Sequence, residues 1–202
     1  MARLVLAIAG LLFVCCAAQA ETYEEMVARV RGGDAAVDYR ALRDAYAASP
    51  QYSPYGGSDE QKKAMRDGFV AGDCVRVLQA AETVLTANFV DVQAHMLSAT
   101  CHERGGDQVS AALHKAVAKG LLDSILASGD GKTTKTAFIV VSVDEEYVVL
   151  SSLGWHMTQQ SLVSDDGHAF DAMQATSRTG ENATFYFQID RLMAWLSHSM
   201  ER

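Results

Sequence analysis

The densest group of side chains that could bind a metal ion or transfer protons lies near the end of the chain. It consists of three aspartates and one histidine: Asp165, Asp166, His168 and Asp171. Carboxylate and imidazole groups together suit a divalent cation. However, Asp-Asp-Gly is also typical of a tight hairpin turn, and alternation along a strand would place His168 and Asp171 on opposite faces. The pattern favours a turn and predicts no metal site, and His168 and Asp171 stay as candidate binding residues.

A second acidic group, Asp144-Glu145-Glu146, could supply paired carboxylates for acid–base catalysis. That chemistry would need one carboxyl group to be desolvated, with a raised pKa. At the start of a helix, the same residues more simply interact with the positive end of the helix dipole. We therefore interpret them as helix-start residues and predict no catalytic residue among them.

Tyrosines are concentrated in one short stretch, at positions 39, 46, 52 and 55. A loop with Tyr52 and Tyr55 beside a helical groove could recognise a peptide or glycan, because tyrosine combines apolar area with a hydroxyl group. The spacing of seven between Tyr39 and Tyr46 instead indicates a core-facing stripe, with Tyr52 and Tyr55 holding the loop against the helices. We favour the structural interpretation and keep Tyr52 and Tyr55 as candidate binding residues.

No other motif predicts a cofactor or a catalytic centre. Gly129-Asp-Gly-Lys132-Thr133 resembles part of a phosphate-binding loop, but Leu126 replaces the first glycine and a strand is expected after the lysine in place of a helix. The chain contains no G-x-S-x-G or H-E-x-x-H motif, and its other histidines are scattered. We expect no cofactor.

The N-terminal residues 1–20 have the pattern of a secretory signal peptide. Arg3 precedes an uncharged apolar stretch, and Ala18 and Ala20 are small residues that favour cleavage between Ala20 and Glu21. The apolar stretch is short for a membrane anchor. A lipoprotein is a further alternative because Cys15 and Cys16 lie near the site, but Val14 is not the small residue expected before a lipidated cysteine. We expect a periplasmic or secreted protein without membrane insertion after cleavage.

Composition restricts the partners. The 202 residues are 49% hydrophobic and carry a net charge of -8, which becomes -9 for the 182 residues after the signal. This chain is too apolar for a disordered tail. Because its acidity is spread evenly, we expect neither nucleic acid nor an anionic membrane as a partner.

Capping residues and helical apolar spacing occur throughout residues 21–128 and predict antiparallel helical hairpins with short loops. The unit from Gly72 to Gly106 has 35 residues, near the length of a tetratricopeptide repeat, but one and a half repeats do not make a solenoid. The predicted helix starts are Thr22-x-x-Glu25, Asp38, Ser58-x-x-Gln61, Gly72-Asp73 and Asp107, and the predicted ends include Gly32-Gly33, Ser49-Pro50, Gly105-Gly106 and Gly120.

Signal cleavage would leave two cysteines, Cys74 and Cys101. With Asn88 at the hairpin tip, they lie 14 residues before and 13 residues after it, so they come level in an antiparallel pair. A Cα separation suited to a disulfide follows, and an exported protein would meet an oxidising compartment. Two buried free thiols are the alternative.

In residues 129–202 the spacing of apolar residues changes from a helical pattern to one typical of strands. Residues 136–143 predict a buried strand, followed by a helix that Ser142 or Asp144 begins. Three strands, 155–163, 168–176 and 184–189, are separated by turn signals, and Asp190 begins a last helix. The order β-α-β-β-β-α predicts a small antiparallel sheet unit after the helical hairpins, and hence an α+β fold.

Several blocks resemble a bacterial exported family known only as a domain of unknown function, number 4919. The blocks span nearly all of the chain after the signal: Val37–Tyr46, Tyr52–Gly56, Lys135–Phe138, Ser142–Tyr147, Gly167-His168 with Asp171, and Phe185–Asp190. The resemblance implies an envelope or secreted protein with a tetratricopeptide-like helical part, and it assigns no functional residue.

We expect a non-catalytic module that binds a protein or peptide of the bacterial envelope. The repeat-like hairpin and the lack of a convergent catalytic set favour this hypothesis. One alternative is an envelope hydrolase that uses carboxylates and His168 near the sheet. Another is a purely structural or stress-related envelope protein.

Overall fold

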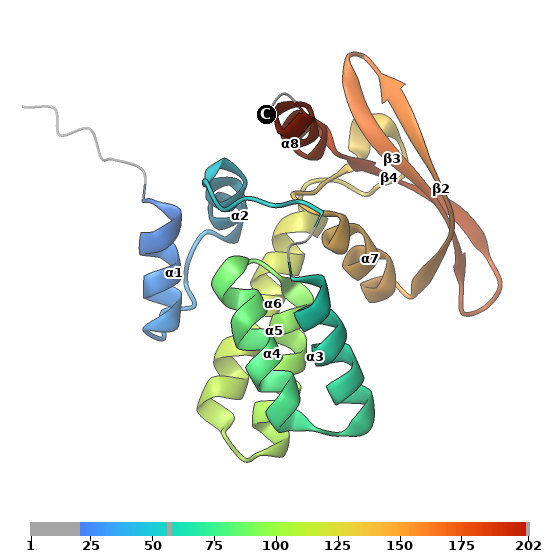
Figure 1. The fold of residues 1–202 in the computed structure, drawn as a ribbon. Coiled ribbons are helices and arrows are strands. Elements are labelled where there is room, and N and C mark those ends of the chain that lie inside the picture. Colours follow the sequence, from blue (N-terminus) through green and yellow to red (C-terminus); the bar gives the residue numbers. More distant parts are fainter. Residues whose placement is uncertain (1–20, 56–57, 201–202) are drawn as a thin grey trace, which may run out of the picture.

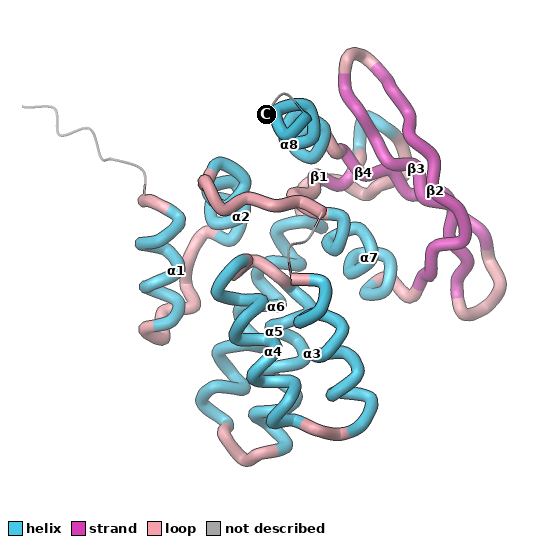
Figure 2. Tube along the Cα trace, in the orientation of Figure 1, coloured by secondary structure: helices cyan, strands magenta, loops and turns pink. Residues whose placement is uncertain are grey.

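The computed structural model describes residues 21–55 and 58–200. The predicted signal peptide, residues 1–20, lies outside the described residues. The chain is an α+β protein whose helices come first and whose sheet comes later (Figures 1 and 2), as predicted. In the described part, no helix has both the length and the apolar character that crossing a membrane would require.

The elements follow the predicted order. The helices are α1 (Tyr23–Arg31), α2 (Tyr39–Ala48), α3 (Asp59–Ala71), α4 (Cys74–Ala87), α5 (Val92–Arg104), α6 (Gln108–Leu126), α7 (Val143–Ser152) and α8 (Asp190–Met200). The strands are β1 (Phe138–Ile139), β2 (Trp155–Asp165), β3 (His168–Ser177) and β4 (Asn182–Gln188), and a 3-10 turn spans Thr134–Thr136.

Side-chain caps define several of the predicted helix starts. Thr22 and Glu25 form a reciprocal capping box at α1, and Asp38 and Asp73 accept hydrogen bonds from the first turns of α2 and α4. Each cap satisfies backbone N–H groups that have no partner within the helix. The predicted capping box at Ser58 is wrong, because the Ser58 side chain makes no cap hydrogen bond.

Helix α6 continues past Gly120, where we predicted its end, to Leu126. The glycine is needed there for packing, because a Cβ atom at this position would lie 2.2 Å from the ring of Tyr39. Gly120 therefore allows α2 to approach α6 closely.

The α4–α5 hairpin is closed by the predicted disulfide. Cys74 begins α4, Cys101 lies in the last turns of α5, and their Cα atoms are 5.2 Å apart. The bond joins residues separated by 27 positions. It removes chain entropy from the unfolded state and so stabilises the fold.

Replacing both cysteines by serine is expected to lower the free energy of unfolding by about 3 kcal/mol, from the length of the closed loop. Urea unfolding of the oxidised wild type and the double variant measures the difference. Reduced wild type, unfolded under the same conditions, is the control and is expected to match the variant. Equal midpoints for the oxidised protein and the variant would contradict the prediction.

The sheet has the strand order β1-β4-β3-β2. Strands β2, β3 and β4 form the predicted antiparallel meander, and the turn between β2 and β3 contains Asp166 in a left-handed conformation. Strand β1 pairs with β4 in the parallel direction. The sheet is therefore mixed, which corrects the predicted antiparallel sheet.

The predicted strand 136–143 is wrong in length, since only Phe138 and Ile139 pair with β4. The Val141 N–H donates to the carboxylate of Glu145, and Ser142 leads directly into α7. Val140 packs in the sheet core and Val141 in the helical core. The branched residues are thus buried as predicted, but in two cores rather than along one strand.

Candidate functional site

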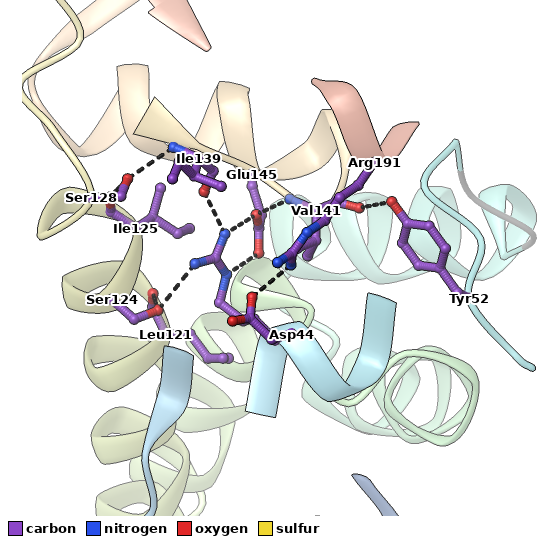
Figure 3. Close-up of polar contacts among 11 residues, drawn as sticks. Asp44, Tyr52, Leu121, Ser124, Ile125, Ser128, Ile139, Val141, Glu145 and Arg191 are labelled. Carbon is purple, nitrogen blue, oxygen red and sulfur yellow. Dashed lines mark hydrogen bonds and ion pairs between the residues drawn. The ribbon is translucent and has the colours of Figure 1, made fainter. Parts of the chain in front are cut away.

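A buried ion pair joins the helical part to the sheet unit. Arg43 on α2 donates to both carboxylate oxygens of Glu145, at 2.8 and 2.7 Å, and also to the Ile139 carbonyl. Each of the two charged side chains is 3% exposed. Figure 3 shows how Glu145, Ile139 and Ser124 surround this contact. Since the charges and hydrogen bonds are satisfied internally, the pair has a structural role.

Glu146, the next residue on α7, is turned by about 100° around the helix from Glu145 and contacts Asp171 on β3. Its side chain is 0% exposed, and in the described residues no N–H or O–H group of another residue donates to its carboxyl oxygens, so a proton shared with Asp171 is what gives this group a hydrogen bond. Burial, reinforced by the nearby negative charge of Asp171, raises the pKa of Glu146 to about 9. The Glu146–Asp171 carboxyl pair therefore holds a proton at neutral pH. The sequence interpretation of these acidic residues as helix-start residues missed this burial.

Two of the candidate binding residues, Asp171 and Tyr55, are near enough to Glu146 to interact with it electrostatically. Asp171 is buried and accepts a hydrogen bond of 2.7 Å from the Gln160 side chain. Tyr55 is exposed, its ring packs against Trp195, and burial and then the Asp171 and Glu146 carboxyl groups raise the pKa of Tyr55. Because Glu146 has no exposed surface, this arrangement offers a substrate no access to that carboxyl group.

The other two candidate residues, Tyr52 and His168, lie apart from this pair. The Tyr52 hydroxyl donates to the Val141 carbonyl at 2.8 Å (Figure 3), and the Tyr52 ring lines a recess between α2 and α8. His168 is exposed, and its Nδ1 contacts the Asp190 carboxylate at 2.6 Å. His168 and Asp171 thus differ in burial as alternation predicts. In residues 21–55 and 58–200, no group of three or more His, Cys, Asp or Glu side chains is arranged so that it could hold a metal ion.

Three histidines also come together, which the sequence interpretation described as scattered. His95 Nδ1 lies 2.9 Å from His114 Nδ1, and His95 Nε2 lies 2.8 Å from the Phe89 carbonyl. The ring of His102 stacks on that of His114. Since a carbonyl can only accept, Nε2 of His95 carries the proton. Burial lowers the pKa of His95 to about 3, so this residue is a neutral core group.

The cleft with the largest volume among the cavities described measures about 690 Å³ and lies where α3, α5, α7 and the start of β2 meet. Met96 on α5 and Tyr147 on α7 line it and are 50% and 43% exposed. Trp155 and Met157 line its side on β2. We call this space the α5–α7 cleft. Exposed large apolar side chains around one cavity are typical of a binding site.

The charged groups that line the α5–α7 cleft, Asp91, Asp144 and Arg66, are balanced with the help of Lys62 next to them. Lys62 forms ion pairs with Asp144 and, at 3.4 Å, with Asp91. Burial alone would lower the pKa of Lys62, but Asp91 and Asp144 outweigh it and the net effect is a raised pKa. Arg66 adds one cation to the lining. The cleft therefore has little net charge with which to attract an ionic ligand.

A family model described as "Domain of unknown function (DUF4919)" matches residues 17–198. The chain belongs to the DUF4919 family. No curated protein and no solved structure matched the chain. The family match covers both the helical hairpins and the sheet unit, so the α5–α7 cleft lies within the part that defines DUF4919.

Sequence reasoning about this DUF4919 chain missed the cleft residues because they come from separate elements. Tyr147 and Trp155 belong to apolar patterns that predict an ordinary helix and strand, and no pattern singles out Met96. Packing alone leaves Met96 and Tyr147 exposed in the lining of one cleft. Neither helix gave a local signal, because apolar residues are not confined to one face of α5 or α7 and an exposed Met96 or Tyr147 does not stand out from its neighbours.

Proposed function

We propose that this protein is an exported, non-catalytic module that binds a short, uncharged, apolar peptide segment of another envelope protein in the α5–α7 cleft. The observation that carries the proposal is the exposure of Met96 and Tyr147 on facing sides of a 690 Å³ cleft. This volume lies within the range of typical ligand sites and can accept several side chains.

The lining of the cleft favours an apolar segment of variable sequence. Methionine is flexible and polarisable, and Met96 and Met157 can therefore adapt to different apolar side chains. Tyr147 and Trp155 add large rings with one polar group each. The balanced charges of Lys62, Asp91 and Asp144 favour an uncharged ligand over an acidic or basic one.

The geometry supports binding better than hydrolysis. The buried Glu146 carboxyl group has no exposed surface, and His168 lies on the opposite face of β3 from Asp171. A hydrolase that uses carboxylates and His168 would need these groups to act on one substrate.

Peptides selected on the purified protein from a random library test this proposal. We expect them to be enriched in apolar residues, to change the fluorescence of Trp155, and to bind the variant Met96→Glu at least tenfold more weakly, because a charge would be buried in the cleft. The variant Val109→Glu is the matched control, since Val109 is exposed on α6 outside the cleft. Equal affinity for both variants would contradict the site.

Export is supported by the signal-peptide pattern of residues 1–20 and is compatible with the Cys74–Cys101 disulfide. We expect the protein recovered from the envelope or medium of an expressing bacterium to begin at Glu21. Mass spectrometry of the intact protein measures this directly. A chain that retains residues 1–20 and stays in the cytoplasm would contradict the export part of the proposal. It would not affect the peptide site, which the library experiment tests separately.

A further inference from the structure

Strand β2 forms a free edge of the sheet. It is the longest strand, with 11 residues, and it is the last in the order β1-β4-β3-β2. Figure 1 shows the β2–β3 hairpin extending away from the helices. In the described part of the chain, no backbone hydrogen bond joins residues 159–165 to any segment other than β3. Alternate N–H and C=O groups of β2 therefore face solvent.

This edge lacks most features that protect exposed strands from pairing. The eight residues Met157–Ser164 include no charged side chain and no proline, and a single bulge lies between Met157 and Gln159. Edge strands are usually protected by lysines, prolines or a covering segment. Leu162 is 60% exposed in the middle of the regular part of the strand. A row of unpaired backbone groups around an exposed leucine is complementary to one kind of partner, another extended strand.

We infer that β2 pairs with β2 of a second copy of this chain, in the antiparallel direction, to form a two-fold dimer with a continuous sheet. The pairing is centred on Leu162, which faces Leu162 of the other copy and becomes covered. Gln159 then faces Asp165, and Gln160 faces Ser164, so no two like charges meet. The whole chain carries a net charge of -8, which opposes self-association, and an edge whose paired residues include only one charged side chain, Asp165 at the end, adds little to that repulsion.

Two features favour a second copy over a free peptide. Antiparallel pairing about a two-fold axis uses both free β2 edges and closes the assembly at two copies. The paired segment, residues 159–165, begins after the bulge and leaves Trp155 and Met157 facing the α5–α7 cleft. Dimerisation is therefore compatible with peptide binding but does not depend on it.

Light scattering coupled to size-exclusion chromatography tests the inference on the purified protein. We expect wild type to have the mass of two chains. Leu162→Lys and Leu162→Asp each place like charges opposite one another, so each variant alone is expected to dissociate, with a dimer dissociation constant about a hundredfold higher. Mixing the two variants pairs opposite charges and is expected to restore the dimer. Val109→Lys, an exposed change on α6, should leave the dimer intact.

Three results would overturn the inference. One is a wild-type mass of a single chain from micromolar to millimolar concentration. Another is a dimer that both Leu162 variants retain. A third is a wild-type dimer that each variant loses but that mixing fails to restore, which would place the contact away from the Leu162 pair. Circular dichroism confirms that the variants are folded, as expected for an exposed position.

Discussion

Replacing Arg43 by methionine is expected to lower the free energy of unfolding by about 3–5 kcal/mol, the cost of leaving a buried charge without its partner. Glu145 would keep only the Val141 N–H as a close donor. Methionine has a similar length and is apolar, so the loss reports the charge and hydrogen bonds rather than a cavity. Equilibrium unfolding in urea measures the change in midpoint at constant slope.

Two further variants of α2 sharpen this experiment. Arg40→Met removes an arginine from an exposed position of the same helix and is expected to change stability by less than about 0.5 kcal/mol. Arg43→Lys keeps the charge but loses the two parallel hydrogen bonds, so its effect should be intermediate. If Arg43→Met and Arg40→Met were equally stable, the ion pair could not be what holds α2 against α7.

Replacing Glu146 by glutamine is expected to stabilise the protein by about 3 kcal/mol near neutral pH. Folding raises the pKa of Glu146 from 4.5 to about 9, so the folded state keeps a proton that the unfolded chain releases between these values. The stability that this proton contributes is fully present below pH 4.5, and it is lost as the pH rises from 4.5 toward about 9. Glutamine has nearly the same shape and stays neutral at every pH.

Urea unfolding of wild type and Glu146→Gln at several pH values measures this effect. The stability difference should be small near pH 4.5 and should grow by about 1.4 kcal/mol for each pH unit above it. Comparing the two proteins cancels the opposite contribution of His95, which favours the folded state less as pH falls below its ordinary value. Glu24→Gln, exposed on α1, is the matched control. A difference independent of pH would mean that Glu146 is ionised in the folded protein.

Local signals in the sequence predicted most of the elements. The capping box of Thr22 and Glu25 and the caps of Asp38 and Asp73 involve residues within one helical turn, so their hydrogen bonds do not depend on the rest of the fold. The same holds for the turn at Asp165–Gly167. The disulfide was predictable because the hairpin tip at Asn88 alone makes Cys74 and Cys101 level.

Predictions failed where a distant residue decided the local structure. The end of α6 was misplaced because Gly120 serves contact with Tyr39, which comes 81 positions earlier. Strand β1 was predicted too long because Glu145 and the two cores, rather than strand propensity, determine the path of Val140 and Val141. In both cases the apolar residues were recognised correctly, but the residue that contacts them, Tyr39 in the first case and Glu145 in the second, could not be inferred from the sequence.

By itself, the sequence determined the α+β class, the order of helices and strands, the meander of β2 to β4 and the disulfide, because periodicity, caps and turns act over short distances. Only the tertiary structure decided the roles of the acidic residues at the start of α7. Asp144 contacts Lys62, Glu145 pairs with Arg43, and Glu146 is buried against β3. Their charges depend on burial and on partners far along the chain, which no local pattern encodes.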